Sequence, residues 1–287
     1  MHRTMQNENI SSAEMTAFWR SEYPKLSHDS LSKFLSSPEG IRKSHEFETK
    51  YNYPLIGRKV SVRAGWFLEE AVYLLKTGYY NSCISLGSGL SMLTYYLSKY
   101  AMANKNLSFL DVDMEEMIAA RTKRISSLDH ELLDGLALNR ISTLALDLEY
   151  SYQSGRKFIE IFGTNQTPVF IIEGMIYFLS KGCVDWIFEG IQSYKNYVVL
   201  FDYWPENAPN MSECFKHSIA TLNNFIPEQT RGLLSSSELN TLCKNSNLTI
   251  VSLQEKEQEF SIKNGEKPQF MDQNSFFPVQ LAIVTPK

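Results

Sequence analysis

The sequence predicts an α/β protein in which a doubly wound, mostly parallel sheet follows an N-terminal helical region. From about residue 78 to the C-terminus, short apolar runs alternate with helical patterns, as they do in parallel sheets with crossover helices. Before residue 78 the apolar residues recur at helical spacing. The chain has 287 residues, of which 43% are apolar, so it can bury the core that such a fold requires.

Two regions follow from this pattern. Residues 1–77 are predicted to form an N-terminal helical lid, broken into helices at Pro24, Pro38 and Pro54. Its best amphipathic segment runs from Val62 to Leu75. Residues 78–287 are predicted to form the sheet domain.

Seven segments have the length and composition of strands, and the chain ends on the last of them without a further helix. A final strand of this kind can insert antiparallel to the others. The polar, proline-containing stretch from Lys263 to Asn274 is predicted to be a surface loop. The predicted strands are Ser82–Leu86, Leu107–Val112, Ile141–Leu146, Val169–Glu173, Tyr197–Asp202, Leu248–Leu253 and Gln280–Thr285.

A glycine turn, Gly87-Ser88-Gly89, separates the first strand from a helix predicted over Leu90–Tyr100. Glycine lets the backbone approach a ligand closely, and a helix start offers free N–H groups. A dinucleotide-binding fingerprint needs a third glycine where Met92 stands. Two glycines suit S-adenosylmethionine (SAM), which has no phosphate, although a tight turn without a ligand remains the alternative.

Acidic residues end the next three strands. Asp111 and Asp113 lie on one face of the second strand, where an acid binds ribose hydroxyls in this architecture, although Asp113 can also cap the next helix. Asp147 can accept from an adenine amino group, beside the apolar wall of Leu148. Glu173 follows a buried run, so it must be solvated, paired with an arginine or directed at a cation such as the sulfonium or ammonium of SAM.

An aromatic segment, Phe201–Pro205, follows the fifth strand. Its aromatic side chains can form the wall of an acceptor pocket, or they can cap the core.

These segments together resemble the leucine carboxyl methyltransferase family. Its SAM-dependent members include the protein phosphatase 2A methyltransferases and the bacterial polyketide carboxyl O-methyltransferases. The resemblance covers roughly residues 30–205, in the order of the family, and implies a Rossmann-like methyltransferase sheet with an antiparallel last strand. The matching segments are Ile56–Ala64, Leu86–Leu90, Asp111–Asp113, Leu146–Leu148 and Ile172–Gly174.

The resemblance implies cofactor-binding roles for individual residues. Arg63 matches the arginine that holds the cofactor's carboxylate, and Lys33 corresponds to a second carboxylate-binding group from the lid. For both, the alternative is a solvated charge on a helix surface. The other implied SAM-binding residues are Gly87 beneath the cofactor, Asp113 at the ribose, Asp147 and Leu148 beside the adenine, and Glu173 after the fourth strand.

The chain departs from the family on the expected acceptor side. The family often has an aspartate where Ser91 stands and an arginine where Leu93 and Thr94 stand. It usually has a tyrosine at the position of Phe178, whereas Tyr177 lies one residue earlier. These differences concern the substrate more than the cofactor, and no catalytic residue is assigned. The acceptor-side candidates are Tyr177, Tyr203 and Trp204.

Composition excludes several classes of partner and site. A net charge of −4 and a pI near 5.8 argue against a general nucleic-acid binder. The N-terminus lacks the apolar core of a signal peptide, and the longest apolar run, Pro168 to Leu179, is too short to span a membrane. We expect a cytoplasmic protein with no metal site. The cysteines, expected to be reduced and without metal-binding spacing, are Cys83, Cys183, Cys214 and Cys243.

The function we expect is SAM-dependent O-methylation of a carboxylate on a small molecule, such as a polyketide-like metabolite. A carboxylate is already ionised at pH 7 and needs no general base, which agrees with the lack of a recognisable catalytic triad. One alternative is a protein C-terminal carboxyl methyltransferase of the phosphatase-methylating type. A second is a non-catalytic SAM-binding or scaffold protein. The oligomeric state is not predicted.

Overall fold

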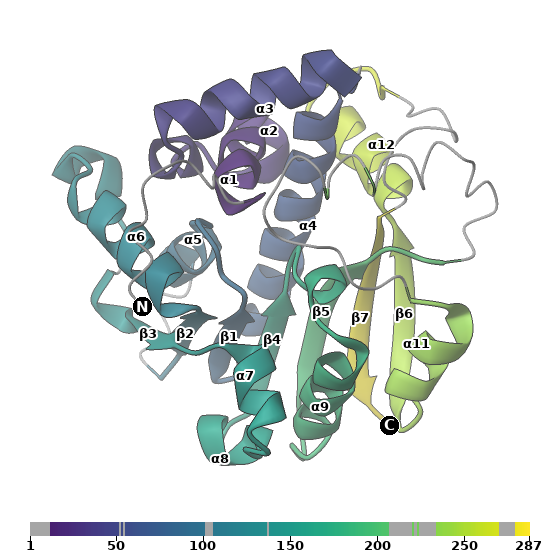
Figure 1. Ribbon diagram of the computed structural model, residues 1–287. Helices are drawn as coiled ribbons and strands as arrows, with labels where there is room; N and C mark the ends of the chain where they lie inside the picture. The colour runs from purple at the N-terminus through teal and green to yellow at the C-terminus, as the bar shows by residue number, and fades with distance from the viewer. Residues whose placement is uncertain are drawn as a thin grey trace.

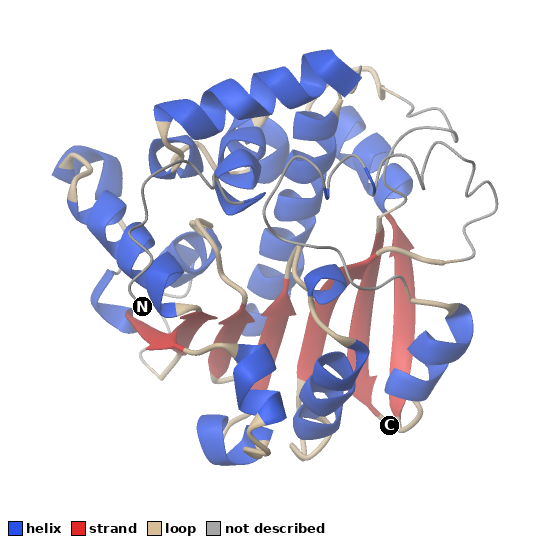
Figure 2. Cartoon of the chain, in the orientation of Figure 1, coloured by secondary structure: helices blue, strands red, loops and turns tan. Residues whose placement is uncertain are grey.

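The computed structural model describes residues 12–51, 53, 55–100, 106–136, 138–206, 220, 223, 234–269 and 279–287. Its strands form one sheet with helices on both faces (Figures 1 and 2), which confirms the predicted fold class. The strands are β1 (Ser82–Leu86), β2 (Ser108–Asp113), β3 (Ile141–Ala145), β4 (Pro168–Ile172), β5 (Val198–Tyr203), β6 (Ser246–Ser252) and β7 (Gln280–Pro286).

The strand order is β3-β2-β1-β4-β5-β7-β6. Neighbouring strands from β3 to β5 pair in parallel, whereas β7 pairs antiparallel with both β5 and β6. The antiparallel last strand is therefore confirmed, and it lies inside the sheet. The chain adds β2 and β3 on one side of β1 and places β4 on the other, so the crevice at the carboxyl ends of β1 and β4 is a topological switch point. Open α/β sheets bind ligands at such points.

Each face of the sheet has its own hydrophobic core. Helices α4 (Ile56–Lys76), α5 (Leu93–Tyr100) and α12 (Leu253–Lys263) pack on one face, through side chains such as Trp66 and Leu97. Helices α7 (Leu148–Gln153), α8 (Phe158–Phe162), α9 (Lys181–Ile191) and α11 (Ser236–Leu242) pack on the other, through side chains such as Phe158 and Phe188. Fully burying a side chain of this size contributes about 1.5–3 kcal/mol. Helix α6 (Glu115–Ser126) contacts β2 and β3.

The N-terminal region is helical, as predicted. Pro24 and Pro38 are the first residues of their helices, where the missing proline N–H would have no intrahelical partner in any case; Pro54 lies outside the described residues. These elements lie over the carboxyl ends of the strands (Figure 1). They are α1 (Ser12–Glu22), α2 (Pro24–Ser27), the 3-10 helix η1 (Ser32–Leu35), α3 (Pro38–Tyr51) and the first turns of α4.

The predicted strand ends lie within two residues of the observed ones, and two further boundaries differ. The helix expected from Leu90 begins at Leu93, because Gly89 has φ +52°, which does not continue into a right-handed helix. The loop expected from Lys263 starts later, because α12 runs through Lys263; its last part, residues 270–274, lies outside the described residues. Short 3-10 helices occur at His130–Leu133 (η2), Leu138–Arg140 (η3) and Ile176–Phe178 (η4).

No helix within the described ranges is both long and apolar enough to cross a membrane.

Candidate active site

A cavity of about 570 Å³ opens at the carboxyl ends of the central strands, within the range of small-molecule sites. Its walls come from α1 and α4 of the lid and from the segments that follow the first five strands. It therefore brings together groups that are far apart in the sequence. Of the residues predicted to bind the cofactor, six line it: Arg63, Gly87, Asp113, Asp147, Leu148 and Glu173.

The turn after β1 requires glycine at its first position. Gly87 has φ +64°, and a Cβ there would lie 2.4 Å from the sulfur of Met175. Next to it, the hydroxyl of Ser88 is buried and has no hydrogen-bond partner among the described residues. Ser88 also lines the cavity. A buried hydroxyl without a partner beside a glycine cradle is a suitable donor or acceptor for a bound ligand.

The two acids of β2 have different surroundings. Asp113 lines the cavity and accepts hydrogen bonds from the backbone N–H groups of Gly89 (2.6 Å) and Met114 (2.8 Å). Burial raises the pKa of Asp113, and these hydrogen bonds oppose the rise. Asp111 is fully buried and accepts from the Arg121 guanidinium (2.6 Å) and the Thr94 hydroxyl (2.8 Å). Asp113 is thus the acid at the cavity, and Asp111 supports the layer beneath it.

The segment after β3 forms a mixed polar and apolar edge. Asp147 caps α7 by accepting from the Tyr150 N–H at 3.0 Å, and the rest of its side chain is exposed. Leu148 is buried and lines the cavity together with Met114 and Met117. An exposed carboxylate beside apolar side chains suits a planar nucleobase, which has apolar faces and a polar edge.

Glu173 lies at the polar end of the cavity, paired with two arginines. Its Oε1 accepts from Arg20 Nη2 (2.8 Å) and from Arg63 Nε (3.2 Å). Of the three alternatives for Glu173, the structure shows arginine pairing, at a position that also lines the cavity.

Arg63 is buried, so the alternative of a solvated charge on a helix surface is wrong for this residue. Its Nη1 donates to the Tyr177 hydroxyl (3.1 Å) and to Asp202 Oδ2 (3.3 Å). Gly174 has φ +69° and leaves room for the guanidinium, since a Cβ there would lie 3.1 Å from Nη2. The N–H of Gly174 donates to Asp202 Oδ1 at 2.6 Å.

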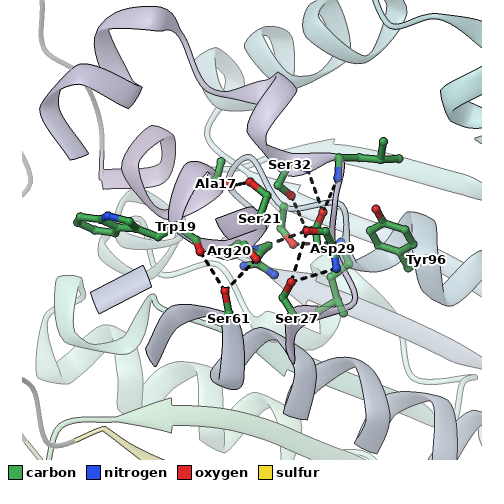
Figure 3. A network of polar contacts seen from close by, with 12 residues as sticks. Ala17, Trp19, Arg20, Ser21, Ser27, Asp29, Ser32, Ser61 and Tyr96 are labelled. Atoms are coloured by element: carbon green, nitrogen blue, oxygen red, sulfur yellow. Dashed lines mark hydrogen bonds and ion pairs between the residues drawn. The ribbon is translucent and has the colours of Figure 1, made fainter. Parts of the chain in front are cut away.

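Sequence reasoning missed Arg20 and Asp202. Arg20 lies three residues after Ala17, on the buried face of α1. An arginine on an otherwise apolar helix face was the sequence signal that could have identified it. Asp202 lies near the end of β5, as the other acids lie at their strand ends. Figure 3 shows Arg20 within the lid, where its Nε lies 3.8 Å from Asp29 Oδ2. The Ser61 hydroxyl of α4 donates to the Arg20 carbonyl at 3.1 Å, and this hydrogen bond joins α4 to α1.

Two predicted site residues are not brought to the cavity. Lys33 is exposed on η1, with its ammonium 5.0 Å from the ring centroid of Phe34. Tyr203 is buried in the core, with its ring centroid 5.8 Å from that of Phe201. Successive side chains of an extended chain point to opposite faces of the sheet, so Tyr203 and Trp204 point in different directions.

The other two acceptor-side candidates do line the cavity. The rings of Tyr177 and Trp204 stack with centroids 4.0 Å apart and an interplanar angle of 11°. Phe178 also lines the cavity. Tyr177, one residue before Phe178, accepts a hydrogen bond from Arg63 through its hydroxyl.

Among the described residues, no group of three or more histidine, cysteine, aspartate or glutamate side chains could hold a metal ion.

A sheet of this order with a cavity over a glycine turn and strand-end acids defines the class of Rossmann-like methyltransferases. The family model for leucine carboxyl methyltransferase matches residues 9–192, more than half of the chain. The chain therefore belongs to the leucine carboxyl methyltransferase family and is a SAM-dependent methyltransferase. No curated protein matches it significantly.

Solved structures with the same fold are distant in sequence. A DUF574 family protein from Streptomyces avermitilis has a TM-score of 0.64 at 8% identity, over 96% of this chain and 97% of that one. A methyltransferase described as putative from Thermobifida fusca has a TM-score of 0.59 at 12% identity, over 96% and 95%. Magnesium protoporphyrin IX methyltransferase from Synechocystis, with bound SAH, has a TM-score of 0.50 at 10% identity, over 87% and 95%. At these identities the similarity establishes the fold.

The cavity residues fit SAM. The glycine cradle and the buried Ser88 hydroxyl leave space and one hydrogen-bonding group for a ligand. The polar end offers both charges that an amino-acid group needs, arginines for a carboxylate and Glu173 for an ammonium.

Proposed function

We propose that this protein is an O-methyltransferase that acts on the carboxylate of a small molecule. The observation that carries the proposal is the composition of the cavity. A polar end with Arg63 and Glu173 adjoins an apolar part with the stacked Tyr177 and Trp204. The polar end suits the cofactor, and the apolar part leaves space for the apolar portion of the acceptor molecule.

The cofactor is held, in this proposal, by residues on four strand ends and two lid helices. Asp113 accepts from the ribose hydroxyls, Asp147 and Leu148 hold the adenine, and Gly87 lies beneath the cofactor. Arg63 and Arg20 bind the carboxylate of its methionine part, and Glu173 accepts from its ammonium. Arg20 thus takes the place first given to Lys33, since both belong to the lid but only Arg20 lines the cavity.

When bound, SAM supplies a methyl group on a sulfonium: an acceptor oxygen lone pair forms the new O–C bond while the C–S bond breaks and its electrons pass to sulfur. The protein's own task is to orient the acceptor and to exclude water. A carboxylate acceptor carries no proton to remove, so no general base is required.

The proposal includes a cytoplasmic location. Cys83 and Cys243 are free and buried thiols, which suit a reducing compartment.

A label-transfer assay tests the proposed function. The protein is incubated with methyl-labelled SAM and either a set of small carboxylic acids or peptides with a free C-terminal carboxylate. We expect base-labile label, released as methanol, on one or more of the small acids, because methyl esters hydrolyse in alkali whereas methyl ethers do not. Base-stable label would overturn the carboxylate acceptor.

Two other outcomes identify the alternatives. Label on peptides alone would indicate a protein C-terminal carboxyl methyltransferase. SAM binding by calorimetry with no transfer to any acceptor would indicate a non-catalytic SAM-binding protein. Binding of NAD with none of SAM would contradict the cofactor itself.

A further inference from the structure

Tyr177 joins the polar end of the cavity to its apolar part. Its hydroxyl accepts a hydrogen bond from Arg63 Nη1 at 3.1 Å, and its ring stacks on Trp204 with the centroids 4.0 Å apart. Tyr177 lies four residues after Glu173, which accepts from Arg63 Nε at 3.2 Å. The short segment after β4 therefore binds the same guanidinium at two of its nitrogens.

The hydrogen bonds of Arg63 leave its third nitrogen for a ligand. Nε donates to Glu173, and Nη1 donates to Tyr177 and to Asp202. Nη2 makes no hydrogen bond with any residue that the structure describes. A Cβ at Gly174 would lie 3.1 Å from Nη2, so the glycine keeps this nitrogen clear on one side. Because a guanidinium is planar, fixing Nε and Nη1 also fixes the direction of the Nη2 donors.

Tyr177 holds Arg63 without neutralising it. Burial, reinforced by the nearby carboxylate of Asp202, raises the pKa of the Tyr177 hydroxyl, so the side chain is uncharged at pH 7. Glu173 and Asp202 already give Arg63 two anionic partners. A third carboxylate in place of the phenol would compete with the carboxylate of a ligand for the same positive charge, whereas a neutral hydroxyl does not.

Asp202 fixes the position of the Tyr177 hydroxyl from below. This fully buried carboxylate accepts from the Tyr177 hydroxyl at 3.4 Å through Oδ2. Its Oδ1 accepts from the N–H of Gly174 at 2.6 Å, within the turn that leads to Tyr177. One buried acid thus orients both the hydroxyl and the backbone that carries it.

We propose that Tyr177 is a positioning residue for the cofactor: its hydroxyl holds the Arg63 guanidinium in the orientation that binds the carboxylate of SAM. This inference rests on the proposed function, which places the methionine part of SAM at Arg63. It gives a cofactor-side role to a side chain whose ring belongs to the acceptor wall. The arginine that binds the cofactor and the wall that faces the acceptor are therefore fixed relative to each other.

A tyrosine at this position can also act through the packing of its ring alone. The two roles differ in one measurable respect. Loss of packing weakens every ligand of the cavity, whereas a misplaced Arg63 weakens only a ligand that carries a carboxylate. S-adenosylhomocysteine (SAH) and 5′-methylthioadenosine are suitable probes, because both contain adenosine and a thioether sulfur but only SAH has the amino-acid group.

The test measures the dissociation constants of both probes by isothermal calorimetry on the full chain. Tyr177→Phe removes the hydroxyl and keeps the ring. Tyr194→Phe is the matched control, because Tyr194 is a buried tyrosine outside the cavity lining whose hydroxyl has no hydrogen-bond partner among the described residues. Arg63→Lys, alone and combined with Tyr177→Phe, tests whether the hydroxyl acts through the guanidinium.

We expect the wild type and Tyr194→Phe to bind SAH about tenfold or more tightly than 5′-methylthioadenosine. In Tyr177→Phe, SAH should bind about five- to tenfold more weakly, with 5′-methylthioadenosine unchanged. In the Arg63→Lys background, Tyr177→Phe should change SAH affinity less than about twofold, because the planar fork that the hydroxyl orients is gone. Equal weakening of both probes by Tyr177→Phe, loss of both, or unchanged SAH affinity would overturn the positioning role.

The wild type separates this inference from the proposed function. If it does not bind SAH, or binds SAH no more tightly than 5′-methylthioadenosine, the placement of the cofactor in the proposed function is wrong. If it prefers SAH and Tyr177→Phe keeps the same preference, only the role of Tyr177 fails. Retained binding of 5′-methylthioadenosine shows that the variant is folded.

Discussion

Arg20 and Glu173, which are 153 residues apart in the sequence, are joined by a hydrogen bond of 2.8 Å between Nη2 and Oε1. Arg20 belongs to α1 of the lid, and Glu173 directly follows β4. Both side chains are about 5–6% exposed. The pair therefore connects the lid to the sheet at the polar end of the cavity, where the methionine part of SAM is proposed to bind.

We expect Arg20→Ala to weaken SAM binding at least about tenfold, because it removes one charge-assisted donor and releases α1 from Glu173. Isothermal calorimetry measures the change. Arg42→Ala is the control, since Arg42 is an exposed arginine that pairs with Glu39 and Glu46 of its own helix. Equal SAM affinity in the Arg20 and Arg42 variants would show that Arg20 is structural only.

Arg63→Ala is expected to weaken SAM binding by about 1.5–3 kcal/mol, the effect of losing a charge-assisted pair. Because Arg63 is buried against Glu173 and Asp202, the same change should also lower the free energy of unfolding by about 3–5 kcal/mol. Urea unfolding and calorimetry separate the two effects. Arg63→Lys should recover part of the stability, and a variant as stable as the wild type would contradict the buried network.

The two acids of β2 should affect different properties. Asp113→Ala is expected to weaken SAM binding by roughly 1.5–3 kcal/mol, because Asp113 lines the cavity. Asp111→Ala should mainly lower stability, since it leaves the buried Arg121 without its carboxylate partner. Calorimetry on both variants, with thermal unfolding as the second readout, decides between them. A larger loss of SAM affinity in the Asp111 variant would reverse the assignment.

The lid should respond to the cofactor. SAM binding is expected to slow amide hydrogen exchange in residues 12–22 and 56–63. Arg20 of α1 and Arg63 of α4 line the cavity, so their contacts with the ligand should stabilise both helices. Residues 84–90 and 111–113 should be protected as well. Helix α8, which contributes no residue to the cavity, provides the internal reference. Protection confined to segments other than these would place the ligand elsewhere.

Relative to the wild type, Lys59→Met should be more stable at pH 7 than above pH 10.5, by up to about 3 kcal/mol at 1.36 kcal/mol per unit of pKa shift. The pKa of Lys59 is lowered from 10.5 to about 8 in the folded chain. Between pH 8 and 10.5 the unfolded chain binds the proton that the folded chain releases, so the wild type gains stability over this window. The advantage of the variant should therefore vanish above it. Urea unfolding at several pH values measures this, with Lys25→Met as control; an advantage independent of pH would contradict the burial of the charge.

The positions of the strands along the chain could be predicted from local patterns. Apolar runs such as Ser82–Leu86 and the strand that ends at Asp113 are recognisable because a buried parallel strand is apolar on both faces. The convergence of Gly87, Asp113 and Glu173 also follows, because the carboxyl ends of parallel strands meet at one edge. The boundary at Leu93 was less predictable, since it depends on one glycine conformation.

Which lid groups reach the cavity was decided by the tertiary structure alone. The sequence by itself determined that the lid is helical and carries basic residues, and both Arg20 and Lys33 satisfied that pattern. Only the docking of α1 against α4 turned Arg20 toward Glu173 and left Lys33 exposed. The strand-end acids were readable because their placement follows from the sheet, whereas a contact between residues 153 apart depends on how two helices pack, and no local pattern encodes that packing.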